Sequence, residues 1–380
     1  MKVTIIGGGA GGLMLASILK KHNANVDIEI HEKLDHVGKK LLLTGNGKCN
    51  LTNKNINSNC YNNEKGYEIA ASYDNTTYFN RLVLMTTTDE QGRVYPLSQT
   101  SNSVLDVLRE SIKDVDVFTS SNVIRVIKEN DKYQIRTDKN QNFESDFVVF
   151  ATGGKTYYKE NNSYLLASMF SHRVTMLRPT LTSLKVSENL ASIENLRSKV
   201  KARLLLNNQV VYEDEGEVLY KKDGLSGIVI FQLSSMIARN PYGRYKIELD
   251  LLPNMEEKDI VNHIDRYPSM IGMFPKMIMQ YIIKNSSSQE KEDIAHTIKH
   301  LTFTVLENID FKNAQVTSGG ISIKEVSDNL ESKNSENLYF VGEILDVDGN
   351  CGGYNLQFAF ASAYKVAMDI IRKVGVKQWN

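Results

Sequence analysis

Three glycines near the start of the chain have the spacing that lets a backbone turn approach a phosphate. Gly7, Gly9 and Gly12 form the pattern G-x-G-x-x-G, and Glu32 follows Gly12 by twenty residues. In such a turn the first glycine permits the tight bend, the second admits a pyrophosphate, and the third allows close packing of helix on strand. A carboxylate at the position of Glu32 accepts hydrogen bonds from an adenosine ribose and disfavours a 2′-phosphate. The spacing therefore predicts a dinucleotide-binding site.

Two later segments concentrate further groups that can hold a polar ligand. Residues 38–53 are rich in glycines, amides and hydroxyls, which could line an extended ligand or form only a turn-rich surface loop. Residues 342–357 place a glycine-rich loop before a helix, where backbone N–H groups can face an anionic atom. Asn50 and Tyr354 in these segments, and Tyr157 between them, are the candidate catalytic residues. We expect a site built from both ends of the chain.

Cysteines and histidines offer other chemistry. Cys49 and Cys351 fall in the two segments and could form a redox pair, but disulfide reductases use cysteines that are close in sequence, so a packing role is favoured. His296 and His300 have helical i, i+4 spacing without the carboxylate of an HExxH pattern. We therefore expect a solvent-facing pair and no metal site.

The elements that would position these residues begin with a βαβ unit. Residues 3–6 form a β-branched run, residues 13–19 carry apolar side chains at helical spacing, and residues 26–30 alternate before Glu32. Further strands are expected at residues 123–127, 133–137, 147–151, 201–206, 227–233 and 338–341, and helical segments at residues 103–112, 256–300 and 355–373.

These elements predict an α/β protein with a Rossmann-like dinucleotide-binding domain. The change in composition after residue 180 indicates an inserted domain of mixed β-strands and helices. We expect the dinucleotide-binding domain at residues 1–180 and 304–380, and the inserted substrate or cap domain at residues 181–303.

The charge balance, the number of cysteines and the length of the apolar runs indicate which partners and which cell compartment to expect. Forty-five basic and forty-five acidic residues give no net charge, so nucleic acid is not expected as the main partner. Three cysteines are unlike the disulfide framework of a secreted domain, and no apolar run is long enough for a signal peptide or a membrane span. We expect a cytoplasmic protein that acts on a small molecule, in an oligomeric state that the sequence does not define.

The chain resembles the YhiN/BaiN family of FAD-dependent oxidoreductases, some members of which are called aminoacetone oxidases. The resemblance lies in the glycine turn at residues 7–12 and in the segments at residues 44–53, 317–322 and 342–357. It implies that the Rossmann-like domain is an FAD-binding domain of the glutathione-reductase-like, two-dinucleotide type. In this domain Glu32 would lie at the ribose, Val123 at the adenine and the start of the closing helix near the flavin N1 and O2 atoms, where its dipole favours negative charge.

The resemblance also implies contacts along the whole cofactor. The implied FAD-binding residues are Gly7, Gly9, Ala10, Gly11, Gly12, Glu32, Lys33, Lys40, Thr44, Gly45, Asn46, Gly47, Lys48, Cys49, Asn50, Val123, Ala151, Thr152, Gly153, Gly342, Glu343, Gly353, Tyr354, Asn355, Leu356 and Gln357. Lys48 stands where arginine is expected in many relatives, and a lysine lacks the bidentate fork of arginine. Arg93, Tyr95, Tyr158 and Ser226 lie in segments that could meet the open face of the flavin.

No second G-x-G-x-x-G follows a strand, so a dedicated NAD(P) domain is not expected. The leading expectation is oxidation of a small amine such as aminoacetone, with oxygen as acceptor, hydrolysis of the imine and formation of peroxide. The alternatives are an NAD(P)H-dependent reductase of an enone-type substrate, a flavin-dependent RNA-modifying enzyme and a non-catalytic flavin sensor.

Overall fold

The chain folds into two compact units, each with its own hydrophobic core. The computed structural model describes residues 1–22, 26–156, 163–268, 270, 272–306 and 311–375. The first unit comprises Met1–Arg178 and Val316–Asn380, and the second comprises Pro179–Gln315. The return to the first domain, placed at residue 304 from the sequence, falls at the end of a strand of the second unit, because Leu301–Thr304 pairs with that unit's sheet.

A parallel five-stranded sheet is the centre of the first unit and confirms the Rossmann-type prediction. Its strand order is β19-β10-β1-β2-β6. The strands are β1 (Lys2–Ile6), β2 (Asp27–His31), β6 (Asp116–Phe118), β10 (Phe147–Phe150) and β19 (Leu338–Phe340). Ile6 pairs with Phe150, so β1 and β10 end level with each other. The loops that follow both strands therefore meet at one edge of the sheet, where this fold binds its ligands.

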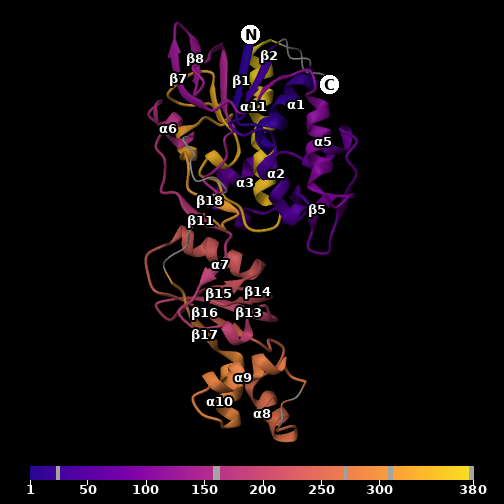
Figure 1. Ribbon diagram of the computed structural model, residues 1–380, viewed down its shortest axis with the longest axis vertical. Coiled ribbons are helices and arrows are strands. Elements are labelled where there is room, and N and C mark those ends of the chain that lie inside the picture. The colour runs from indigo at the N-terminus through magenta and orange to yellow at the C-terminus, as the bar shows by residue number, and fades with distance from the viewer. Residues whose placement is uncertain (23–25, 157–162, 269, 271, 307–310, 376–380) are drawn as a thin grey trace. The chain divides into compact units, whose positions relative to one another are not determined.

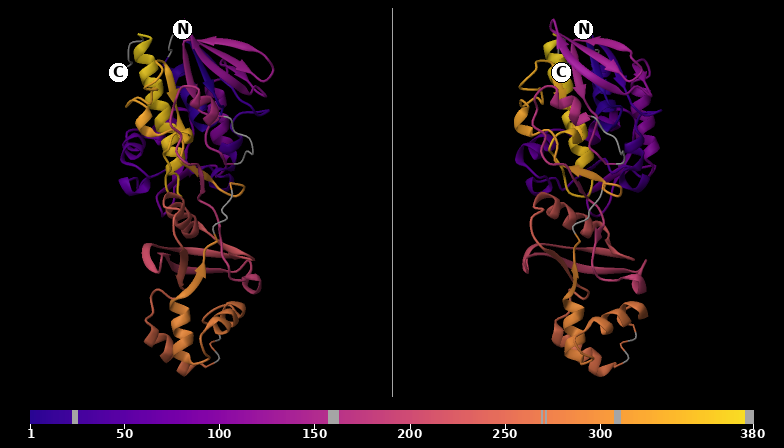
Figure 2. Two further views of the ribbon diagram at one scale, coloured as in Figure 1. Left: turned by 90° about the vertical axis from the view of Figure 1, so that its left-hand side faces the viewer. Right: turned by 60° about the vertical axis from the view of Figure 1, so that its left-hand side comes forward.

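Two long helices pack side by side in the first unit. α1 (Ala10–Lys21) contacts both β1 and the closing helix α11 (Tyr354–Lys373), as Figures 1 and 2 show. Residues 13–19 of α1 are buried on every side, because α5 (Ser101–Ser111) covers a further face of this helix. A helix enclosed in this way is largely apolar, and residues 13–19 of α1 contain Ser17 as their one polar side chain.

Smaller elements complete the first unit. They include the sheets β3-β5-β4 and β7-β8-β9. The strands are β3 (Thr52–Asn53), β4 (Thr86–Thr88), β5 (Arg93–Pro96), β7 (Val123–Glu129), β8 (Lys132–Thr137) and β9 (Asn142–Ser145); the helices are α2 (Lys39–Leu43), α3 (Glu64–Ala71), α4 (Asn75–Arg81) and α6 (Ser163–Ser168). β11 (Arg178–Thr180) pairs with β18 (Val316–Ser318) where the chain leaves and re-enters this unit.

The second unit is built on an antiparallel six-stranded sheet of order β12-β15-β14-β13-β16-β17. Figure 2 shows α7 on one side of this sheet and the group α8 to α10 on the other. The strands are β12 (Leu184–Lys185), β13 (Arg197–Leu206), β14 (Gln209–Lys221), β15 (Gly224–Ser226), β16 (Tyr245–Asp250) and β17 (Leu301–Thr304); the helices are α7 (Ile228–Arg239), α8 (Glu257–Arg266), α9 (Lys276–Asn285) and α10 (Lys291–Lys299).

The strand expected at residues 227–233 is wrong, because this segment forms the start of α7. Its β-branched run is typical of a strand. However, Val229, Leu233 and Ile237 are buried at i, i+4 and i+8, which is the spacing of a helix face packed on β14. Tertiary packing has overridden the local β-preference here.

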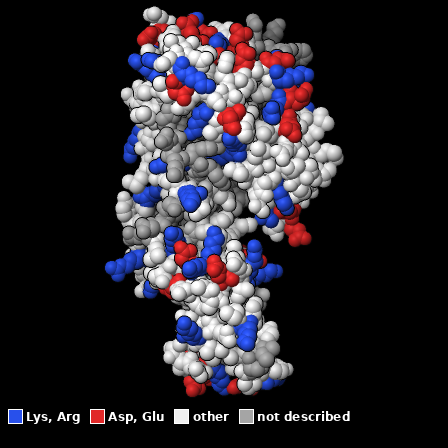
Figure 3. Space-filling model, in the orientation of Figure 1, with Lys and Arg blue, Asp and Glu red and all other residues white. Residues whose placement is uncertain are grey.

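The described surface is mixed in charge. Lysine and arginine side chains lie among aspartate and glutamate side chains on the face shown in Figure 3, in keeping with equal totals of the two signs. Among the described helices, none combines the length and the apolar character needed to cross a bilayer.

Candidate cofactor and active site

The glycine turn between β1 and α1 leaves room for a ligand at one position and for none at another. A Cβ atom at Gly12 would lie 2.0 Å from the carbonyl oxygen of Gly7, so only glycine lets the helix approach the turn this closely. A Cβ atom at Gly9 would meet nothing within 4 Å. Gly9 is also the N-cap of α1 and provides no side-chain cap. The first N–H groups of α1 thus face an open space that suits a pyrophosphate.

Glu32 closes the same end of the sheet next to this turn. Its carboxylate accepts hydrogen bonds from the backbone N–H groups of Gly8 and Leu34, each at 2.9 Å. Each oxygen has a further lone pair that can accept from a ribose hydroxyl. The side chain is buried, so its charge is held in place beside the turn.

A pocket lies beside Glu32 and runs along the ends of β1, β2 and β7. The buried hydroxyl oxygen of Thr152 in its wall has no hydrogen-bond partner among the described residues. A buried polar atom without a partner is costly, and a bound ligand would satisfy it. The lining residues are Ile6, Gly7, His31, Glu32, Lys33, Ser121, Asn122, Val123, Thr152 and Leu166. Glu32 and Val123, the residues expected at the adenosine end of a dinucleotide, both line this pocket.

Glu343 joins three segments of the first unit. Its carboxylate accepts from the Lys40 ammonium at 2.5 Å, from the Thr317 N–H at 2.7 Å and from the Gly154 N–H at 3.3 Å. The Lys40 ammonium also donates to the Thr156 hydroxyl at 2.6 Å. Lys40 and Glu343 were expected at the site, whereas the contribution of Thr317 and Gly154 was not. Their donors are backbone groups, which residue type does not reveal.

The start of α11 presents a second set of backbone N–H groups without a side-chain cap. Gly353 caps this helix with φ of 100°, and a Cβ atom there would lie 2.5 Å from the Thr52 carbonyl oxygen and 2.7 Å from Asn50 Oδ1. No side chain caps α11, and Asn50 Oδ1 is buried without a partner among the described residues. The free N–H groups of the first turn and the Asn50 amide can together hold the polar edge of a ring system.

The loop at residues 44–50 folds back against this helix start. Gly45, Asn46, Gly47 and Cys49 all have positive φ, which bends the chain tightly. A Cβ atom at Gly45 would lie 2.8 Å from the backbone nitrogen of Asn50 and 3.5 Å from the ring of Tyr95. Thr44 is half-buried and residues 45–48 are exposed. The loop, Asn50, Gly353 and Tyr95 are therefore contiguous.

Tyr95 and Arg93 project from β5 beside the loop. Burial raises the pKa of Tyr95, so its phenol stays protonated and can donate a hydrogen bond. The Arg93 guanidinium donates to Asp89 Oδ2 at 2.7 Å and to Gln91 Oε1 at 2.9 Å, which fixes its orientation. A hydroxyl donor and a guanidinium cation thus lie two positions apart on one strand.

Cys49 and Cys351 carry thiols rather than thiolates. Neither forms a disulfide bond within the described residues. Burial raises the pKa of Cys49 to about 12 and that of Cys351 to about 11. A thiol is a poor nucleophile until it ionises, so neither cysteine is activated at neutral pH.

Two residues expected at the ligand use their side chains inside the unit instead. The ring of Tyr354 packs edge-on against Tyr61 with centroids 6.1 Å apart, and its hydroxyl faces Cys60. The Gln357 amide donates to the carbonyl oxygens of Ala70 and Tyr73 at 2.6 and 2.8 Å. Both side chains hold α11 against neighbouring segments, which leaves only the backbone of residue 354 at the helix start.

Apart from Tyr157, Tyr158 and Ser226, the other expected residues belong to the segments described above. Ala10 and Gly11 begin α1, Ala151 and Gly153 follow β10, Gly342 precedes Glu343, and Asn355 and Leu356 lie in the first turn of α11. Lys48 is exposed. Tyr157 and Tyr158 lie outside the described residues, and Ser226 belongs to β15 of the second unit.

Comparison with known proteins identifies one matching protein family and two relatives of similar length. The family described as HI0933-like protein Rossmann domain matches residues 1–369. A 3-dehydro-bile acid Δ4,6-reductase of Clostridium scindens is 34% identical over 96% of this chain and 97% of its own. A ribosomal RNA dihydrouridine synthase of Haemophilus influenzae is 25% identical over 97% and 98%.

Solved structures resemble the fold. A 3-ketosteroid Δ1-dehydrogenase of Sterolibacterium denitrificans, solved with 1,4-androstadiene-3,17-dione, has a TM-score of 0.51 and 11% identity, with 98% of this chain and 99% of that chain covered. At this identity the likeness concerns the fold alone.

Proposed function

Because the chain belongs to the HI0933-like Rossmann-domain family and is an FAD-dependent oxidoreductase, we propose that it reduces a carbon–carbon double bond conjugated to a carbonyl group in a small molecule. The electron donor in this proposal is NAD(P)H. The net reaction adds the hydride of the nicotinamide to one carbon of the double bond and a proton from solvent to the other. This is the second of the functions expected from the sequence rather than the leading one.

The names of two relatives support this chemistry. One reduces a Δ4,6 system in a 3-dehydro bile acid, and the other forms dihydrouridine in ribosomal RNA. Both substrates contain a double bond next to a carbonyl group. Neither name describes oxidation of an amine, so the aminoacetone expectation remains a prediction without support from these relatives.

The residues of this chain would bind FAD at two helix starts. The open space at Gly9 accommodates the pyrophosphate, Glu32 the ribose, and the start of α11 with Asn50 the polar edge of the flavin ring. When bound, FAD carries two electrons between the nicotinamide and the substrate. The positive end of α11 favours negative charge that develops beside it.

Tyr95 is the observation that carries the proposal for the substrate. Hydride addition to an enone moves negative charge onto the carbonyl oxygen, which a nearby donor stabilises. A Cβ atom at Gly45 would lie 3.5 Å from a ring carbon of Tyr95 and 2.8 Å from the backbone nitrogen of Asn50, so Tyr95 lies beside this loop. Burial raises the pKa of the Tyr95 phenol, which keeps it protonated. Arg93 on the same strand supplies a positive charge. The pair can therefore position and polarise a carbonyl group next to the bound flavin.

Anaerobic stopped-flow spectroscopy tests the proposal. We expect NADH or NADPH to bleach the flavin, and a cyclic enone to restore its colour under anaerobic conditions. Tyr95→Phe should slow the restoration by enone by about 10²-fold, the order found for loss of one donor to a developing oxyanion, while bleaching by NAD(P)H is unchanged. Bleaching by aminoacetone together with inertness to NAD(P)H would overturn it in favour of amine oxidation.

Ribosomal RNA is a second candidate substrate because two relatives carry the name ribosomal RNA dihydrouridine synthase. The chain has equal numbers of basic and acidic residues, which gives no general attraction to a phosphate backbone. Restoration of the flavin colour by a ribosomal RNA transcript, but not by free uridine or a cyclic enone, would favour this candidate.

A further inference from the structure

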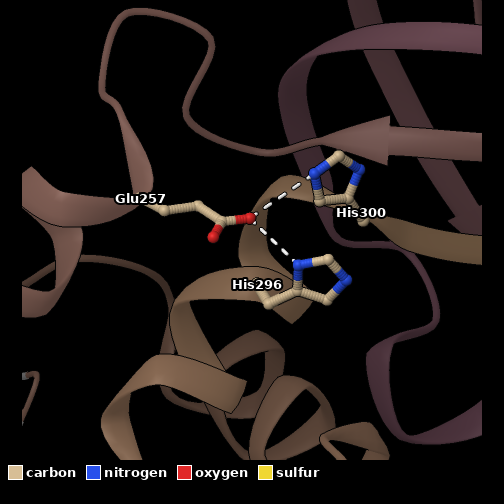
Figure 4. A group of neighbouring side chains, drawn as sticks. All are labelled: Glu257, His296 and His300. Atoms are coloured by element: carbon tan, nitrogen blue, oxygen red, sulfur yellow. Dashed lines mark hydrogen bonds and ion pairs between the residues drawn. The ribbon is translucent and has the colours of Figure 1, made fainter.

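A cluster of two histidines and a glutamate lies in the second unit, remote in sequence from every residue of the proposed cofactor site. Glu257 begins α8, His296 lies in the last turn of α10, and His300 caps that helix. Figure 4 shows both imidazole rings directed at one carboxylate oxygen of Glu257. One ligand-type atom from each residue lies within 4.8 Å of those from the other two.

The distances suit three ligands around one ion. Glu257 Oε1 lies 3.0 Å from His296 Nδ1 and 3.5 Å from His300 Nε2. Atoms bonded to one zinc ion at about 2.1 Å and at tetrahedral angles lie about 3.4 Å from one another. An ion could therefore take its place between these atoms after only small side-chain rotations. Two imidazoles and a carboxylate also form a common protein ligand set for zinc.

A contact between His300 and Glu248 is the second observation that points to a metal. His300 Nδ1, the ring nitrogen turned away from Glu257, lies 3.1 Å from Glu248 Oε2. The other oxygen of Glu248 accepts from the Arg203 guanidinium at 2.8 Å. In metal sites a ligating histidine regularly donates its second N–H to a carboxylate that is itself held by a hydrogen bond, which fixes the ring and its tautomer. Arg203, Glu248 and His300 form such a chain.

The three side chains of the cluster are accessible to solvent. The side chains of Glu257, His296 and His300 are 45%, 65% and 36% exposed, so an ion can reach them from solvent and keep water in its remaining positions. The nearby Lys299 is paired with Asp250 and donates to the carbonyl oxygens of Leu252 and Met255. Its ammonium is therefore directed to other acceptors.

We propose that Glu257, His296 and His300 bind a divalent transition metal ion of the Zn²⁺ type, with Glu248 as a positioning residue for His300. The ion would link the start of α8 to the end of α10 and leave at least one position open to water or to a further ligand. Sequence alone pointed away from this site, because the carboxylate comes from a different helix and no HExxH pattern contains it.

Zinc binding by the full-length, tag-free, FAD-loaded protein tests the proposal. Zn²⁺ is titrated against a chromophoric chelator for the wild type, for the double variant His296→Ala/His300→Ala, and for His263→Ala. His263 is the matched control because it lies on α8 and its ring packs against the ring of Tyr267. We expect one equivalent of zinc that is lost in the double variant and kept in the control. Equal titrations of the wild type and the double variant would overturn the proposal.

Two further readouts separate a metal site from a surface ion pair. Glu248→Gln should weaken zinc binding by roughly 10- to 100-fold, the range found when a carboxylate behind a metal-bound histidine is changed. Co²⁺ in place of zinc should give weak absorption bands to the red of the flavin, without a thiolate charge-transfer band, in the wild type but not in Glu257→Gln. Unchanged zinc affinity in Glu248→Gln would exclude its positioning role, and a thiolate band would assign the ion to a cysteine instead. Flavin absorbance and melting temperature without metal confirm that each variant is folded.

Discussion

Gly9→Ala is the substitution that separates binding of the cofactor from folding of the protein. A methyl group at Gly9 meets no protein atom within 4 Å, and its backbone, with φ of −85° and ψ of −165°, is open to any residue. The cost to the FAD-free protein is therefore only the difference between glycine and alanine as a helix N-cap, about 1 kcal/mol or less. The same methyl group would occupy the space in which the pyrophosphate approaches the backbone.

The expected loss of FAD affinity follows from the hydrogen bonds that this approach allows. A backbone N–H bonded to a charged phosphate oxygen contributes about 1.5–3 kcal/mol. Loss of one such bond costs about 1.5–3 kcal/mol, which weakens binding roughly 10- to 150-fold. The assay is titration of FAD-free wild type and variant with FAD, followed by quenching of flavin fluorescence, with urea unfolding of the same FAD-free samples.

Gly12→Ala is the contrasting variant. Its Cβ atom would lie 2.0 Å from the Gly7 carbonyl oxygen, so it should destabilise the FAD-free protein itself. If Gly9→Ala bound FAD as tightly as the wild type, the pyrophosphate would not cross the turn at Gly9, and our reading of that open space would be refuted.

Three other variants or conditions have definite expected outcomes. Gln357→Ala leaves the Ala70 and Tyr73 carbonyl groups without a donor, so the free energy of unfolding should fall by about 2–4 kcal/mol in urea while the flavin spectrum stays unchanged; a spectral shift would place the amide at the ring instead. Glu32→Ala should weaken FAD binding by roughly 10- to 150-fold through loss of a charged acceptor, as measured by isothermal titration; an unchanged affinity would remove Glu32 from the ribose. Cys351 and Cys49 should react slowly with iodoacetamide at pH 8, because burial raises their pKa values to about 11 and about 12 and the thiolate is the reactive form. The reaction should become faster as the pH rises toward each pKa. Fast modification of these two cysteines in the native protein at pH 7, measured by mass spectrometry, would contradict the buried-thiol assignment.

The sequence predicts the parts of the site whose chemistry depends on local spacing. The glycine turn and Glu32 belong to one βαβ unit, so twenty residues of sequence fix their relation to each other. The parallel sheet followed from the same unit and from the apolar run that became β10. The sequence predicts these features because residues that are close in the chain are also close in space.

The parts that the sequence could not predict depend on contacts between distant segments. Whether a side chain of α11 faces the ligand or the interior is decided by α3 and α4, against which Gln357 packs. The Glu257 carboxylate reaches His296 across 39 residues of chain, and no residue type in between records this. The β-branched residues of α7 predict a strand because such residues fit a pleated surface. Packing against β14 instead determines which face of this helix is buried.

The division of the first unit between the two ends of the chain has a consequence for biosynthesis. During synthesis on the ribosome, β1, α1 and β10 emerge long before β19 and α11, while Pro179–Gln315 is continuous and has its own core. The second unit can therefore complete its folding while the nascent first unit still lacks an edge strand and its longest helix. The flavin site would then be complete only after α11 has been synthesised, so release of the polypeptide before this helix would yield a protein without bound flavin rather than one of reduced activity.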